Sequence, residues 1–198
     1  MKTTDKTWKD VTLEQAVALE KIKAEGIDAV IQQQAILQNK TIDEIENTPM
    51  VELTKSQEEW KCIGSLPKEK RTPTAKIGKN IYALCDFSKM SLAQMVDIEE
   101  YYREGMLDNA HKIISVIMLP AKRKWKWFGS WTTEEYESNE ERENDMLKLD
   151  METVWGNMLF FSTIVNLYMT GLVDYSRGIL DQETKRLRNR HLTVQEKQ

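Results

Sequence analysis

Three local motifs fix where helices begin in this chain. In each, a hydroxyl residue is followed three positions later by Gln or Glu: Thr12 with Gln15, Thr41 with Glu44, and Ser91 with Gln94. In such a capping box the hydroxyl accepts a hydrogen bond from the backbone N–H of the third helical residue, and the side chain of that residue accepts one from the N–H of the cap. Because apolar residues at helical spacing follow each motif, the chain is expected to be mainly helical.

The first part of the chain is expected to form a helical region over residues 1–66. A first helix should span residues 13–24 and end near Gly26, and Asp28 should cap a second. A very short third helix stops at Pro49, and a fourth follows it.

The character of the sequence changes after a proline-bracketed, basic linker at residues 67–71. The stretch TAKIGKNIYALCDF alternates in a strand-like way around the turn residues Gly78, Lys79 and Asn80. This pattern predicts one small β-hairpin around residues 74–86, with strands at 74–78 and 80–86. Such a hairpin is too small to be stable alone and should pack on helices.

Two more helices are expected in the middle of the chain. The first begins after Ser91 and stops near Gly105, with candidate inward positions at Leu92, Met95, Val96 and Ile98. Asp108 should cap the second, which is apolar nearly all round, should therefore be central, and is closed by Pro120.

A long uncharged stretch, residues 154–173, imitates a membrane span in its length. Because Asn157 and Asn166 interrupt it, a buried amphipathic helix is the preferred interpretation. The charged residues 181–198 should form a flexible tail. The predicted fold class is therefore mainly α (α+β), with an N-terminal helical region at 1–66, a hairpin and helices at 67–180, and a tail.

The segment LPAKRKWKWFGSW, residues 119–131, is the main candidate for a site. Tryptophan is enriched at binding hot spots, and three tryptophans lie here beside four cations. The alternative is an internal clasp, with the tryptophans in the core and the cations facing residues 134–145, which carry seven acids and one base. The predicted partner-binding residues are Trp125, Trp127, Phe128, Trp131, Lys124 and Lys126.

Groups suited to catalysis or metal binding are sparse in the sequence. The two histidines, His111 and His191, lack a companion motif, and neither H-x-x-x-H nor C-x-x-C spacing occurs. No glycine cluster suggests a phosphate site. We therefore expect no enzyme activity, no catalytic residue, no metal and no cofactor.

The overall charge argues against a dedicated nucleic-acid binder. The chain has 28 basic and 32 acidic side chains, whereas proteins that bind duplex DNA need the opposite balance. The start MKTTDKTWKD has no apolar run, so secretion is not expected, and Cys62 and Cys85 should stay reduced in a cytosol. A disulfide between these two cysteines remains an alternative.

The order of several short landmarks resembles a family of phage proteins. These landmarks are WKDVTLEQ at 8–15, IDEIENTP at 42–49, KIGKNIY at 76–82, MSLAQMVDI at 90–98, IISVIMLP at 113–120 and NMLFFS at 157–162. Together they are similar to small proteins of tailed bacteriophages, especially of Bacteroidetes-type hosts, that are described as tail assembly chaperones or small phage structural proteins. The likeness spans residues 8–180, and the lysine–tryptophan segment and basic tail are not part of it.

The resemblance implies a non-enzymatic morphogenesis protein of the host cytoplasm. Its partners would be tape-measure or tail-tube subunits, and it would bind no small-molecule substrate. Two alternatives stay open. One is a structural connector or neck protein of the virion, and the other is a nucleic-acid-binding regulator that uses residues 122–126 with Arg186, Arg188 and Arg190.

Overall fold

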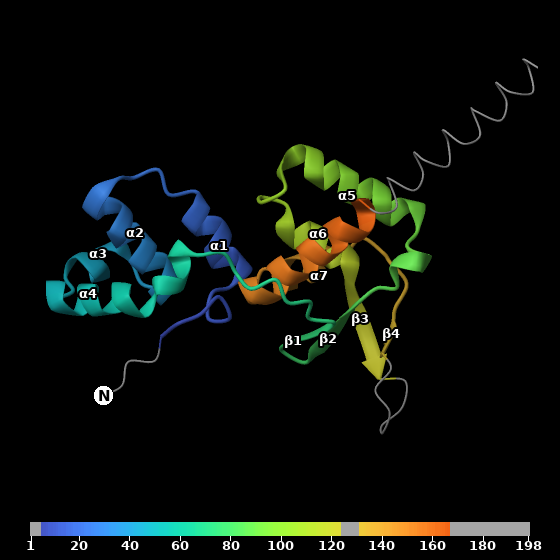
Figure 1. Cartoon of the computed structure of the whole chain (residues 1–198), viewed down its shortest axis with the longest axis horizontal. Helices are drawn as coiled ribbons and strands as arrows, with labels where there is room; N and C mark the ends of the chain where they lie inside the picture. Colours follow the sequence, from blue (N-terminus) through green and yellow to red (C-terminus); the bar gives the residue numbers. More distant parts are fainter. Residues whose placement is uncertain (1–4, 124–130, 167–198) are drawn as a thin grey trace, which may run out of the picture. The chain divides into compact units, whose positions relative to one another are not determined.

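The computed structural model describes residues 5–123 and 131–166, and it confirms a mainly α (α+β) fold (Figure 1). The helices in chain order are α1 (Leu13–Glu20), α2 (Gly26–Gln38), α3 (Ile42–Glu46), α4 (Met50–Glu59), α5 (Leu92–Gly105), α6 (Ala110–Ile117) and α7 (Glu140–Met146). The strands are β1 (Thr74–Ile77), β2 (Asn80–Leu84), β3 (Met118–Arg123) and β4 (Trp131–Thr133), and short 3-10 turns lie at η1 (Lys61–Gly64) and η2 (Phe87–Lys89). A further helix covers residues 151–166.

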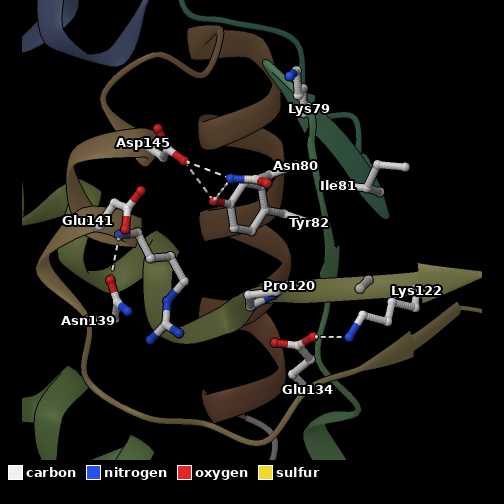
Figure 2. A pocket seen from close by; sticks show the side chains of 12 residues that line it. Lys79, Asn80, Ile81, Tyr82, Pro120, Lys122, Glu134, Asn139, Glu141 and Asp145 are labelled. Carbon is white, nitrogen blue, oxygen red and sulfur yellow. Dashed lines mark hydrogen bonds and ion pairs between the residues drawn. The ribbon is translucent and has the colours of Figure 1, made fainter.

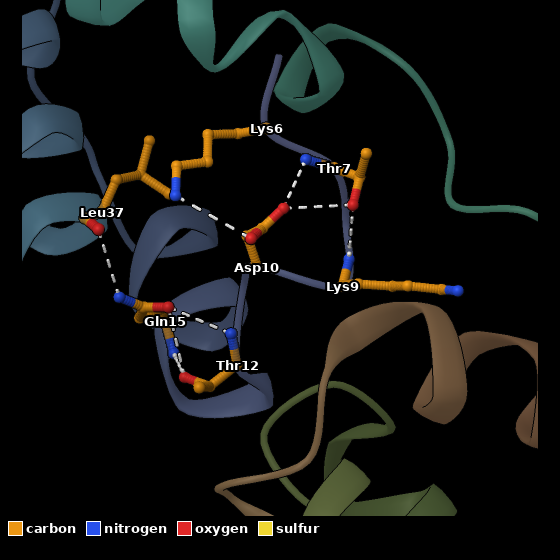
Figure 3. A network of polar contacts seen from close by, with 7 residues as sticks. All are labelled: Lys6, Thr7, Lys9, Asp10, Thr12, Gln15 and Leu37. Carbon is orange, nitrogen blue, oxygen red and sulfur yellow. Dashed lines mark hydrogen bonds and ion pairs between the residues drawn. The ribbon is translucent and has the colours of Figure 1, made fainter. Parts of the chain in front are cut away.

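All three predicted capping boxes are formed, with both of their hydrogen bonds. Figure 3 shows the first, in which the backbone N–H of Thr12 donates to Oε1 of Gln15 at 3.0 Å. The same Gln15 side chain reaches α2 through its Nε2, toward the carbonyl oxygen of Leu37. The motif therefore starts α1 and also joins it to α2.

The predicted boundary between the first two helices is wrong. α1 ends at Glu20, and α2 begins at Gly26 without a side-chain cap. Asp28 lies in the first turn of α2, where a negative charge favours the helix dipole but cannot cap. The second, third and fourth helices share a small core of Ala35, Ile45 and Leu53, with Val30 and Ile31 packed against it.

The predicted hairpin is present but belongs to a larger sheet. The strands β1 to β4 pair antiparallel in chain order, and Ile77 pairs with Asn80 across a two-residue loop. Gly78 has a φ of 57°, the conformation that the first loop position of a type II′ turn requires. The expectation of a single hairpin is corrected, because β3 and β4 form a second one.

Pro120 does not close a helix, contrary to prediction. The apolar helix α6 ends at Ile117, and the chain passes directly into β3, which pairs with β2. The carbonyl oxygen of Pro120 accepts a hydrogen bond from the backbone N–H of Glu134 at 2.9 Å, just beyond the end of β4. A proline fits here because the ladder with β4 ends at this position and needs no donor from it.

The centre of the fold is α6, as its apolar sequence predicted. Its residues Ile113, Ile114, Val116 and Ile117 are completely buried. The helix α5 has the predicted bounds, and Ile98 is buried, but Leu92 and Val96 are exposed rather than inward.

The start of α1 is joined by backbone pairing to the start of the helix at 151–166. The N–H of Leu13 donates to the carbonyl of Leu149 at 2.8 Å, and the N–H of Met151 donates to the carbonyl of Val11 at 2.8 Å. Residues 1–158 form one compact unit, and a second begins at Leu159, of which residues 159–166 are helical. The division expected near residue 67 stays a prediction, and the tail at 181–198 lies outside the described residues.

The described part of the uncharged stretch, residues 154–166, is helical. Asn157, one of the two asparagines that interrupt it, is fully buried. Within the described part of the chain, no helix has the length and apolar character needed to cross a membrane.

Candidate functional site

The second hairpin positions the predicted site. Strands β3 and β4 pair through Ala121–Thr133, Lys122–Thr132 and Arg123–Trp131, and residues 124–130 link them. Of the predicted contact residues, Trp131 is therefore described, as the first residue of β4 and half-buried. Lys124, Trp125, Lys126, Trp127 and Phe128 lie outside the described residues.

The two described cations of this hairpin, Lys122 and Arg123, contact side chains of β4 and of the residue that follows it. Nζ of Lys122 lies 2.8 Å from Oε1 of Glu134, and Cζ of Arg123 lies 5.7 Å from the centre of the Trp131 ring. The contact between Lys122 and Glu134 agrees with the part of the clasp interpretation in which the cations face the acidic segment, whereas Arg123 contacts a tryptophan of the same hairpin. An exposed pair such as Lys122–Glu134 adds little stability but lowers the positive field that an external polyanion would meet.

Trp131 lines a pocket of about 650 Å³ between β4 and the start of α5. Ser91 and Gln94, the capping box of α5, are also part of its lining, as is Tyr136. The hydroxyl of Tyr136 donates to Oδ2 of Asp97 at 2.5 Å. Burial and the neighbouring Asp97 carboxylate raise the pKa of this phenol, so it stays protonated at neutral pH.

A second pocket of about 440 Å³ is lined by the start of β2, by β3 and by α7 (Figure 2). Its polar centre is the carboxylate of Asp145. The hydroxyl of Tyr82 donates to Oδ2 of Asp145 at 2.8 Å, and Nζ of Lys148 donates to Oδ1 at 2.8 Å. The amide of Asn80 lies 3.4 Å from the same Oδ2, as Figure 2 shows.

These contacts determine the ionisation states of Asp145 and Tyr82. The hydrogen bond from Lys148, followed by those from Tyr82 and Asn80, lowers the pKa of Asp145, so its carboxylate is charged at neutral pH. Burial, followed by the bond to Asp145, raises the pKa of Tyr82 to about 12. The charged carboxylate of Asp145, held by three donors, and the protonated phenol of Tyr82 fix the geometry of this pocket. Neither group has a pKa near 7, so neither is suited to transfer a proton at neutral pH.

Arg142 is the one base among the acids of residues 134–145, and it is buried. Its Nη2 donates to the backbone carbonyl of Glu137, and its Cζ lies 5.4 Å from the centre of the Tyr136 ring. Its Nε has no hydrogen-bond partner among the described residues. The sequence holds a signal for this buried position, because Arg142 is the one positive charge in an acidic run. That signal was not used in the sequence-based prediction.

The described histidine does not form part of either pocket. His111 lies on α6, half-buried, and burial lowers its pKa. In residues 5–123 and 131–166, no group of three or more His, Cys, Asp or Glu side chains is arranged to hold a metal ion. Cys62 and Cys85 are both free, and burial raises the pKa of the Cys85 thiol to about 11.

An exposed apolar surface on α5 was missed by the sequence analysis. Leu92 is 81% exposed and Val96 is 52% exposed, and their spacing of four residues places them on one side of the helix. Leu92 follows the Ser91 that lines the Trp131 pocket. We call Leu92 and Val96 the α5 surface.

The geometry of both pockets suits binding by shape and hydrogen bonds. Comparison with known proteins does not assign the chain to a family. No protein-family model matches the chain, and neither a curated protein nor a solved structure matches it.

Proposed function

We propose that this protein is a non-enzymatic phage morphogenesis factor, a tail assembly chaperone that binds tape-measure or tail-tube subunits in the host cytoplasm. The observation that carries the proposal is the α5 surface, where the two large apolar side chains of Leu92 and Val96 stand exposed one helical turn apart. The phage resemblance of the sequence supplies the class of partner.

The energetics of the α5 surface favour an apolar partner. Burying one exposed Leu or Val side chain contributes about 1.5–3 kcal/mol. Leu92 and Val96 are exposed over more than half of their area in the described structure, so most of that gain is still open to a partner. A chaperone for aggregation-prone subunits needs such a surface, because it must cover the apolar area that those subunits expose before assembly.

The test is co-expression of the tagged chain with the tail-tube and tape-measure proteins of its phage, followed by affinity capture. The wild type should retain one of them, and a Leu92→Ser, Val96→Ser double variant should retain much less. The matched control is Met50→Ser with Val51→Ser on α4, because these side chains are 64% and 66% exposed at a different place. Failure of the wild type to retain any tail component would reject the proposal.

The two alternatives separate in simple measurements. Mass spectrometry of purified particles would find a connector or neck protein in the virion, whereas a chaperone leaves before maturation. A nucleic-acid regulator would bind with an affinity that falls steeply with salt. The ion pair between Lys122 and Glu134 argues against that role for Lys122.

A further inference from the structure

The strand β1 is an open edge of the four-stranded sheet. Ile77 and Asn80 flank the tight turn and exchange backbone hydrogen bonds, and the N–H of Leu84 donates to the carbonyl of Pro73 at 3.0 Å. In an antiparallel ladder, residues whose backbone N–H and C=O groups face the paired strand alternate with residues whose backbone groups face away from it. The backbone N–H and C=O groups of Thr74 and Lys76 therefore point away from β2, as a template for another strand.

A groove of about 610 Å³ runs beside this edge, and its charge is strongly one-sided. Five cations and two acids line it. The cations are Lys9, Lys70, Arg71, Lys76 and Lys148, and all five are exposed. This is the opposite of the whole chain, whose net charge is −4.

The two acids of the groove are already engaged. The carboxylate of Asp150 accepts from the backbone N–H and the hydroxyl of Thr153, at 2.9 and 2.8 Å, and so caps the helix at 151–166. Glu152 is buried and lies 4.0 Å from Nζ of Lys9. Neither acid therefore competes with an incoming ligand for Lys70 or Lys76.

Two cations of the groove have no ion-pair partner among the described residues. Lys148 pairs with Asp145, but Lys70 and Lys76 form no ion pair with any side chain of the described residues. Lys76 is on β1 itself, and Lys70 precedes the strand by four positions. Both lysines therefore line the same groove as Thr74.

The wall of the groove is held in place by tight packing. The backbone of Lys70 lies so close to Gly156 that a Cβ there would meet its carbonyl oxygen at 2.0 Å. The side chain of Asn157 exchanges two hydrogen bonds of 2.9 Å with the backbone of Thr72. An ordered edge lowers the entropy cost of binding a strand.

We propose that this groove binds an acidic segment of another protein in extended conformation, added as a strand to β1. The outward N–H and C=O groups of Thr74 and Lys76 pair with the ligand backbone, and Lys70, Arg71 and Lys76 pair with its carboxylates. The four residues of β1 give a template of about 13 Å at ~3.3 Å per residue. A peptide is favoured over nucleic acid because only a peptide complements both the donors and the acceptors of an open strand.

The test uses fluorescence anisotropy with a labelled peptide of alternating glutamate and valine, added to the full-length chain. Peptides of alternating lysine and valine, and of proline and glutamate, serve as comparisons. The Glu-Val peptide should bind, and the other two should not. Oligothymidylate is the nucleic-acid probe, and it should bind more weakly than the Glu-Val peptide.

Two variants separate charge from backbone pairing. Lys70→Glu with Lys76→Glu should weaken Glu-Val binding roughly tenfold, whereas Lys55→Glu with Lys61→Glu, an equal charge change on exposed residues elsewhere, should not. Thr74→Pro removes one outward donor without changing charge, and it should also weaken binding, whereas Thr74→Ala should not. Circular dichroism confirms that each variant is folded.

Several results would overturn the proposal. These are absence of Glu-Val binding to the wild type, equal binding of the Lys-Val peptide, or unchanged binding in both groove variants. Preferred binding of oligothymidylate that is insensitive to Thr74→Pro would instead assign the groove to nucleic acid. The inference does not depend on the proposed function, because the Leu92→Ser, Val96→Ser variant should bind the Glu-Val peptide normally.

Discussion

Gln15 and Gln94 play the same double role in two different helix pairs. Each accepts the capping-box hydrogen bond with Oε1 and donates with Nε2 to a last-turn carbonyl of a second helix. Gln15 donates to Ile36 on α2 at 3.0 Å, and Gln94 donates to Val116 on α6 at 3.2 Å. The amide is needed at both positions, because a carboxylate can make the first contact but not the second.

This relationship predicts unequal effects of exchanging Gln and Glu. Gln15→Glu keeps the capping box but places a charge against the carbonyl of Ile36, and it should lower the free energy of unfolding by about 2–3 kcal/mol. The reverse exchange at the exposed Thr41 box, Glu44→Gln, should leave the free energy of unfolding close to that of the wild type. Urea unfolding at neutral pH measures both, and equal effects would contradict the double role.

The two hydrogen bonds between Asn157 and Thr72 predict a large loss on truncation. Asn157→Ala leaves both backbone groups of Thr72 without their partner in a half-buried place, and should cost about 2–4 kcal/mol. Asn144→Ala is the control, because Asn144 is exposed on α7. A cost below about 1 kcal/mol in urea unfolding would show that water replaces these bonds.

Gly156 should not tolerate any side chain. The added Cβ of Gly156→Ala would overlap the backbone of Lys70, which cannot rotate away, so the free energy of unfolding should fall by about 3 kcal/mol. Gly64→Ala is the matched control, because nothing lies within 4 Å of its Cβ position. Thermal unfolding of both variants checks the difference, and similar melting temperatures would contradict the close approach.

The phenol of Tyr82 predicts a specific loss of stability in alkali. Its pKa is about 12 in the folded chain, against 10.0 for the free phenol, so folding favours the protonated form. Its contribution is fully present below pH 10 and is lost as the pH rises toward 12. The stability advantage of the wild type over Tyr82→Phe should therefore shrink across this range.

Unfolding curves of the wild type and Tyr82→Phe at about pH 8 and about pH 11 provide the measurement. The two proteins differ only at residue 82, so the difference between their stabilities isolates Tyr82. An advantage that stays constant with pH would show that the bond to Asp145 does not control the ionisation of this phenol.

The features that sequence predicted well are those with local causes. The capping boxes at Thr12, Thr41 and Ser91 form because their atoms lie within one turn of each other. The turn at Gly78 follows from a residue that accepts positive φ. The bounds of α5 were also correct, because a cap and a glycine mark its two ends.

The wrong predictions concern places where residues distant in the sequence determine the local structure. The apolar run before Pro120 fits a helix or a buried strand equally well, and the switch to β3 depends on pairing with β2. The helical period of α5 and the burial of Ile98 were predicted correctly, but Leu92 and Val96 are exposed, contrary to prediction, and Gln94 is buried.

The candidate site was predicted only in part. The attraction of Lys122 to the acidic segment could be read from neighbouring charges, and Glu134 is its partner. The pocket around Asp145 could not, since Tyr82 is 63 residues away and nothing in either local sequence signals the contact.

The backbone pairing of Val11 and Leu13 with Met151 and Leu149 has a consequence for synthesis on the ribosome. Residues near the start of the chain have their partners almost at the end of the described part. A nascent chain must therefore hold its first helix without these bonds until residue 151 has left the exit tunnel. This closure therefore has to wait until every element from α1 to α7 has been synthesised.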